Sequence, residues 1–188
     1  MGGFPPLMFC VRRLAFWGAV FAIVVGCATP ASADSLAIPA TGSINSTCSI
    51  ALASSFPSAN FAVSASVGAT ATLNCNTRFK VNATSTNGAI RTLKSPPTGF
   101  TNALAYSLSL NVPLDQGGSV SATCPAAQLV AGQAGCALSP ANATGLSSGA
   151  GTSVNKTAAL TAAWTLPAAK LIAGSYSDTI TISVAPQP

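Results

Sequence analysis

Apolar and small polar residues alternate along much of this chain, and this period of two is the feature that most restricts its fold. Successive side chains of an extended strand point to opposite faces, so the alternation predicts strands that each bury one face. Pro113 and Pro167 end two of the alternating stretches, because proline offers a sheet no N–H. The alternating apolar positions are Phe61, Val63, Ala65, Val67, Ala71, Leu73, Cys75, Phe79, Val81, Ala83, Leu104, Tyr106, Leu108, Leu110, Val112, Ala158, Leu160, Ala162, Trp164 and Leu166.

Turn-forming clusters rich in glycine, proline and asparagine separate these stretches, at residues 87–88, 96–99, 116–118 and 147–151. About seven short strands divided by such turns indicate an antiparallel β-sandwich of immunoglobulin-like type. The stretch from Pro113 to Thr157 is the least regular. We predict that it forms long loops on the outer surface.

The last alternating stretch, residues 173–184, bears most on function. It places Tyr176, Ile180, Ile182 and Val184 on one face and small polar residues on the other. A sandwich whose last strand lacks a neighbour leaves N–H and C=O groups unpaired, and a strand from another chain can satisfy them. These four residues are therefore the predicted acceptor edge.

The N-terminus has the order of a secretory signal peptide. Arg12 and Arg13 precede an uncharged apolar run, which is followed by small residues ending at Ala33. The run is shorter than the roughly 20 residues of a membrane-spanning helix. We therefore expect residues 1–33 to be a cleaved signal peptide and the mature chain to have no membrane span.

Other ways of processing the N-terminus remain open. Met8 would give a short basic leader of ordinary form, so the start is at Met1 or at Met8. The residues before Cys27 resemble the lipobox of bacterial lipoproteins, which would make this cysteine a lipidated N-terminus. Retention of the apolar run as an anchor is the third alternative.

Cleavage after Ala33 leaves an even number of cysteines, as expected in an oxidising compartment. Four cysteines allow three pairings, and the sequential pairing closes the shortest loops. We therefore favour bonds between Cys48 and Cys75 and between Cys124 and Cys136.

The composition argues against an enzyme. The chain has three acidic residues in all, every one an aspartate, and no histidine, so few groups could act as general acid or base near neutral pH. The cysteines lack the paired C-x-x-C spacing of a zinc site. We expect no catalytic residues, cofactor or bound metal.

A basic cluster raises the question of nucleic-acid binding. Arg78 and Lys80 alternate with Phe79 and Val81, as the solvent face of a strand would. Arg91 and Lys94 follow without forming a second basic stripe, and the net charge is small. We expect no nucleic-acid partner.

Five segments, taken in order, carry a resemblance to a known family. They are Thr47–Ile50, Leu73–Cys75, Arg91–Leu93, Leu104–Leu108 and Ala173–Thr179. Together they resemble the spore coat U domain family, which includes the pilin subunits of archaic chaperone-usher pili. The resemblance spans about Leu36 to Val184, within a single domain of residues 34–188.

Two features depart from the pattern of that family. Its members commonly finish on an aromatic residue, whereas here Val184 is followed by Ala-Pro-Gln-Pro. Cys124 and Cys136 are an additional pair in an insertion.

The resemblance implies an incomplete immunoglobulin-like sandwich, completed by a donor strand. A periplasmic chaperone fills the open groove first, and at an outer-membrane usher the N-terminal extension of the next pilin subunit replaces it. Within residues 34–47, one face carries the expected donor positions Leu36, Ile38, Ala40, Gly42 and Ile44. The alternative is that this segment is the first strand of its own domain.

The function implied is that of a structural subunit of a surface pilus, or fimbrium, with roles in cell adhesion and biofilm formation. The protein would be secreted, pass through the periplasm and end at the cell surface. Its partners would be the chaperone, the usher and neighbouring subunits. One alternative is a secreted spore-coat or extracellular matrix protein. Another is a pilus-tip adhesin, which the presence of only one domain disfavours.

Overall fold

Five strands form the larger sheet. The computed structural model describes residues 41–141 and 145–187, and each neighbouring pair of strands in this sheet is antiparallel. The strands at its two edges are the first and last of the order, which is β1 (Cys48–Ser54), β2 (Ala65–Cys75), β10 (Ser153–Trp164), β7 (Tyr106–Pro113) and β8 (Ser119–Pro125).

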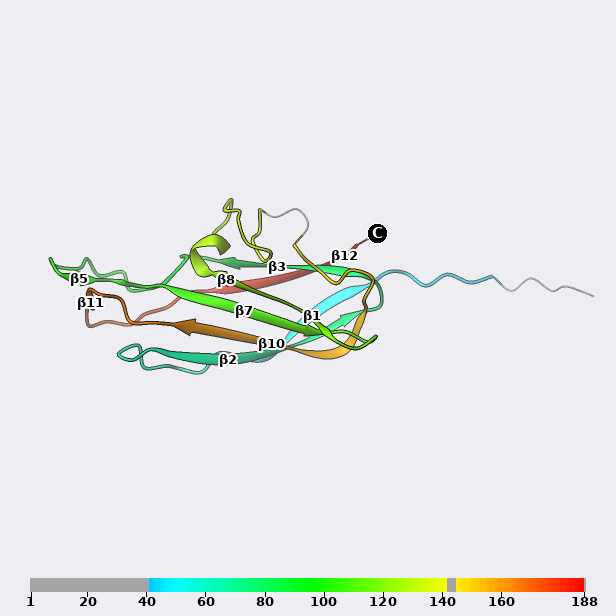
Figure 1. The fold of residues 1–188 in the computed structure, drawn as a ribbon, viewed down its shortest axis with the longest axis horizontal. Coiled ribbons are helices and arrows are strands. Elements are labelled where there is room, and N and C mark those ends of the chain that lie inside the picture. The colour runs from blue at the N-terminus through cyan, green and yellow to red at the C-terminus, as the bar shows by residue number, and fades with distance from the viewer. Residues whose placement is uncertain (1–40, 142–144, 188) are drawn as a thin grey trace, which may run out of the picture. The chain divides into compact units, whose positions relative to one another are not determined.

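A second, smaller sheet has the order β12 (Ile180–Pro186), β3 (Phe79–Ser85) and β9 (Leu146–Ser147), again antiparallel. Figure 1 shows β3 and β12 along one layer, with β7, β10 and β2 in the other. Apolar side chains from both layers meet in one core. The predicted all-β antiparallel sandwich is therefore confirmed.

Short elements join the layers. β4 (Ile90–Arg91) pairs antiparallel with β6 (Ala103–Leu104), and β5 (Phe100–Thr101) pairs parallel with β11 (Lys170–Leu171). β5 and β11 lie beyond the ends of β7 and β10, at the left of Figure 1. A single 3-10 turn, η1 (Ala126–Leu129), follows β8.

The alternation in the sequence corresponds to alternate burial and exposure along the strands. In β3, every second residue from Phe79 to Ser85 is buried and those between are half-buried. Trp164, at the end of β10, is 4% exposed, and its indole N–H donates to the carbonyl of Val63 at 2.9 Å. Fully burying a leucine, valine or phenylalanine stabilises the fold by about 1.5 to 3 kcal/mol. The core residues therefore supply most of the stability of the sandwich.

Both expected disulfides are present. Cys48 and Cys75 lie directly opposite one another in the β1–β2 ladder, so their bond ties the edge strand β1 to its neighbour. Cys124 is buried in β8 and is bonded to Cys136 in the connection that follows.

The strand predicted from Phe61 begins later, at Ala65. The side-chain oxygen of Asn60 accepts the N–H of Ala62 at 2.9 Å, a local bond that competes with extended pairing. The turn places Phe61 over Trp164, with the ring centroids 5.2 Å apart. This residue therefore packs on the core, as its alternation suggested, but does so from a loop.

The prediction of surface loops from Pro113 to Thr157 was wrong in part. β8 is a regular strand of seven residues, and Leu129 and Leu138 are fully buried. The backbone N–H of Ala83 donates to the carbonyl of Leu138 at 2.8 Å. This connection therefore covers an edge of the smaller sheet and contributes to the core.

Candidate functional site

The outer edge of β12 is unpaired in the described part of the chain. β12 pairs with β3 along its whole length, from Ile180 opposite Ser85 to Pro186 opposite Phe79. Ile180, Ile182 and Val184 are half-buried and pack against the core, while the residues between them are more exposed. The alternation predicted for these three positions is confirmed. In an antiparallel strand, alternate N–H and C=O groups face outward, so this edge presents a row of free donors and acceptors.

Tyr176 does not belong to this edge, contrary to its predicted place. The terminal strand begins at Ile180, and only an isolated bridge between Ser177 and Arg91 precedes it. The phenol of Tyr176 donates to the carbonyl of Ile172 at 2.9 Å. The side chain of Asp178 accepts the N–H of Thr179, which interrupts the strand pattern at that point.

β1 provides a second unpaired edge, from the other layer. It pairs only with β2 in the described residues, and some of its Cα atoms come within 8 Å of those of β12. Leu52 of β1 is 70% exposed. Because paired strands lie about 4.8 Å apart, a strand inserted between two others needs about 9 to 10 Å. The two edges therefore face one another across a gap that is narrower than this over part of its length.

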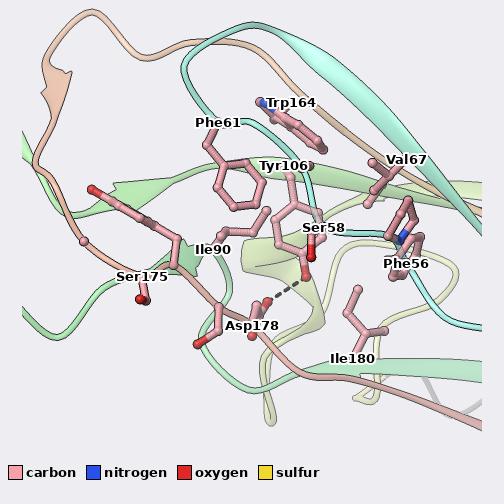
Figure 2. A pocket seen from close by; sticks show the side chains of 16 residues that line it. Phe56, Ser58, Phe61, Val67, Ile90, Tyr106, Trp164, Ser175, Asp178 and Ile180 are labelled. Carbon is pink, nitrogen blue, oxygen red and sulfur yellow. Dashed lines mark hydrogen bonds between the residues drawn. The ribbon is translucent and has the colours of Figure 1, made fainter.

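A cavity of about 500 Å³ lies between the layers, where β1 has ended and β12 begins. Figure 2 shows Trp164 and Phe61 along one wall, and Asp178 and Ile180 along the other. Aromatic and aliphatic side chains dominate this lining, which also includes Phe56, Val67, Ile90, Tyr106 and Tyr176. We call this cavity, together with the facing outer edges of β1 and β12, the open side of the sandwich.

A carboxylate lies in the wall of this apolar cavity. Asp178 accepts hydrogen bonds from the hydroxyls of Ser85 and Tyr106, both at 2.6 Å. Burial, and next the hydrogen bond to Asp178, raise the pKa of Tyr106 well above its ordinary value, so its phenol stays protonated and donates. Tyr106 and Asp178, which both line the cavity, are thus bonded to one another, and Ser85 of β3 donates to the same carboxylate.

The predicted donor positions fall mostly outside the described residues. This applies to Leu36, Ile38 and Ala40, whereas Gly42 and Ile44 are described and exposed, Ile44 by 90%. Neither of the two belongs to a strand. Just after them, the carbonyl of Asn45 and the N–H of Thr47 bond to the side chain of Asn76.

Sequence reasoning missed the cavity and the role of Asp178. A signal for the aspartate was available, because it is one of only three acidic residues in the chain and follows Tyr176 in a stretch whose other residues are all uncharged. An isolated carboxylate in such a stretch is usually paired or hydrogen-bonded. The cavity depends on how two distant loops meet, which no local pattern shows.

Three further features of the described residues concern metal, membrane and nucleic-acid binding. In residues 41–141 and 145–187, no three histidine, cysteine or acidic side chains gather as a metal site would need. That part of the chain also contains no helix with the length and apolar character to cross a membrane. Of the basic cluster, Lys94 donates to the carbonyl of Ala173 at 3.0 Å, within its own domain.

Comparison with known proteins gives no relative: no protein-family model, curated protein or solved structure matches this chain.

Proposed function

We propose that this protein is a structural subunit of a surface pilus, in which each subunit is completed by a strand from its neighbour. The observation that carries the proposal is the open side of the sandwich. There, in the described part of the chain, the unpaired edges of two strands from different layers approach one another, and a cavity lined largely by apolar side chains lies beyond the end of β1, at the start of β12.

A strand entering the open side would pair with the free backbone groups of β12 and place side chains in the cavity. Its backbone would pair with the outer edge of β12, and alternate side chains would enter the core beside Ile180 and Ile182. Ladder hydrogen bonds give such additions their affinity, and the pockets give them specificity. Because β1 and β12 approach closely over part of their length, uptake of a strand must also draw them apart.

The donor would be residues 36–44 of a second copy. Leu36, Ile38 and Ile44 would each bury a side chain, worth about 1.5 to 3 kcal/mol apiece. Ala40 and Gly42 are small, which suits the narrower part of the gap. A periplasmic chaperone would occupy the open side before assembly, and an outer-membrane usher would be the place of exchange.

The proposal is tested on the surface material of cells that make the full chain. Sheared material is run unboiled and boiled on a denaturing gel, and a ladder that collapses on boiling is expected. Ile38→Asp should abolish the ladder, because a carboxylate has no partner in an apolar pocket.

The matched control is Thr41→Asp, which adds the same charge on the opposite face of the donor segment. It should leave the ladder largely intact. A normal ladder from Ile38→Asp would show that this segment is not the donor. Absence of any ladder from the unchanged protein would instead favour a coat or matrix component that associates without strand exchange.

A further inference from the structure

We infer that Asp178 is a positioning residue for the open side. Its carboxylate fixes where β12 begins and holds the wall of the cavity, so that an entering strand meets an edge in the correct register. The part of this inference that concerns an entering strand rests on the proposed function.

The carboxylate accepts four hydrogen bonds, two on each oxygen. Oδ2 accepts the hydroxyls of Ser85 and Tyr106, both at 2.6 Å. Oδ1 accepts the backbone N–H of Asn87 at 3.0 Å and that of Thr179 at 2.8 Å. Figure 2 shows the phenol of Tyr106 pointing at this carboxylate, on the cavity side. Hydrogen bonds to a charged group are among the stronger ones in proteins.

The four donors come from different parts of the fold. Ser85 is the last residue of β3, and Asn87 lies in the turn that follows it. Tyr106 opens β7 in the other sheet, and Thr179 immediately precedes β12. One side chain therefore ties both layers to the point at which the chain enters its terminal strand.

This point sets the register of the edge. Ile180 opposite Ser85 is the first pair of the β12–β3 ladder. Asp178 accepts one hydrogen bond from Ser85 itself and another from Thr179, the residue before Ile180. A slip of one residue would turn every side chain of β12 to the other face. Ile182 and Val184 would then leave the core, and the edge would present the wrong residues to a donor.

The chemistry calls for an aspartate specifically. An asparagine has the same shape, but its amide nitrogen cannot accept a hydrogen bond. With its oxygen toward Asn87 and Thr179, the amide can still donate from its nitrogen to the hydroxyls of Ser85 and Tyr106, which can accept. All of these bonds then lose the charge of the carboxylate, and the two hydroxyl protons lose their acceptor. Buried donors left without an acceptor are costly, and Ser85 is only 1% exposed.

The test uses the processed chain, the variants Asp178→Asn and Tyr106→Phe, and a labelled synthetic peptide of residues 34–47 as the donor probe. Two quantities are measured well below the melting temperature, namely the rate of peptide uptake and the hydrogen exchange of backbone amides. Tyr106→Phe keeps the ring in the cavity wall and removes one of the four donors. Asp115→Asn, at an exposed aspartate away from the cavity, is the matched control.

Asp178→Asn should slow peptide uptake by about tenfold or more, in line with four hydrogen bonds that lose the charge of their acceptor. Exchange should accelerate across residues 177–182, with β10 unchanged. Tyr106→Phe should shift both quantities in the same direction by less, and Asp115→Asn should shift neither.

Uptake at the unchanged rate in Asp178→Asn would overturn the inference. Should the unsubstituted chain take up no peptide, the proposed function fails. The exchange data then decide the inference alone: acceleration confined to residues 177–182 supports it, and unchanged exchange overturns it. If Asp178→Asn does not fold, the same two measurements on Tyr106→Phe decide between these outcomes.

Discussion

The two sides of the smaller sheet differ in how their edges are treated. On the covered side, β3 is flanked by β9, and the carbonyl of Leu138 accepts a hydrogen bond from the N–H of Ala83 in β3. On the open side, β12 pairs with β3, and its own outer edge pairs with no strand among the described residues. This chain can therefore close an edge with irregular segments of its own, and within the described residues it does so on one side only.

The covered side is formed by irregular segments that are held in place by tertiary contacts. Leu129 and Leu138 are fully buried although neither lies in a strand. The disulfide between Cys124 and Cys136 fastens this segment to β8. The open side has instead a regular alternating strand beside a cavity. The covered side is therefore closed by loop residues of the chain, whereas on the open side a cavity lies beside a regular strand.

The largest effect is expected from truncating a side chain on the covered side. Leu138→Ala should lower the free energy of unfolding of the subunit by about 2 to 5 kcal/mol, because a fully buried leucine leaves a void. Ile182→Ala, at a half-buried position of the open side, should cost the isolated subunit much less. Chemical denaturation of the purified variants measures both. Equal losses would mean that the two sides are equally complete.

The disulfides sharpen the comparison through a smaller effect, the difference between their two contributions. Cys48 and Cys75 are 27 residues apart, and Cys124 and Cys136 are 12 apart. Loop entropy predicts a contribution of about 3.5 kcal/mol from the first and about 3 kcal/mol from the second. The first also anchors the edge strand β1, so its removal should loosen the open side.

Replacing each pair by serine and measuring unfolding gives the order. We expect the Cys48–Cys75 pair to matter more, and hydrogen exchange in β1 to accelerate only in that variant. The comparison would be broken if loss of the Cys124–Cys136 bond were the one that freed β1.

The smallest expected effect is a pH dependence of the stability that arises from Asp115, which lies on neither the covered side nor the open side. A hydrogen bond from Thr152, and then weaker contacts with Val154 and Lys156, lower the pKa of Asp115 below its ordinary value of 3.8. A carboxyl with a lowered folded pKa stabilises the fold above its unfolded pKa and loses that contribution as the pH falls through the folded value. The stability difference between the unchanged chain and Asp115→Asn should therefore be constant from pH 7 to about 5 and shrink below about 4. A difference that grew on acidification would contradict the assignment.

The sequence predicted the regular parts of this molecule and not the irregular ones. Alternation placed Leu108, Leu110 and Trp164 in the core because a strand has only two faces, and local order decides which residues share one. It failed for Leu138, whose burial depends on a contact with β3 far away in the sequence. Loop segments have no regular alternation of apolar residues from which burial could be predicted.

The same distinction applies to the candidate site. The half-buried face of Ile180, Ile182 and Val184 was predicted from alternation and is confirmed. Tyr176 was misplaced, because the carboxylate of Asp178 takes the N–H of Thr179 and delays the strand. A side chain that competes with the backbone ladder is invisible to a pattern that counts only apolar residues.

The central claim is that a second copy of the chain fills the open side. A photo-crosslinking amino acid at position 38, in filaments assembled from a mixture of light and heavy isotope-labelled copies, measures this directly. We predict crosslinks from position 38 to β12 or β1, joining a light copy to a heavy one. Crosslinks found only within single copies, or only to residues away from the open side, would contradict the claim.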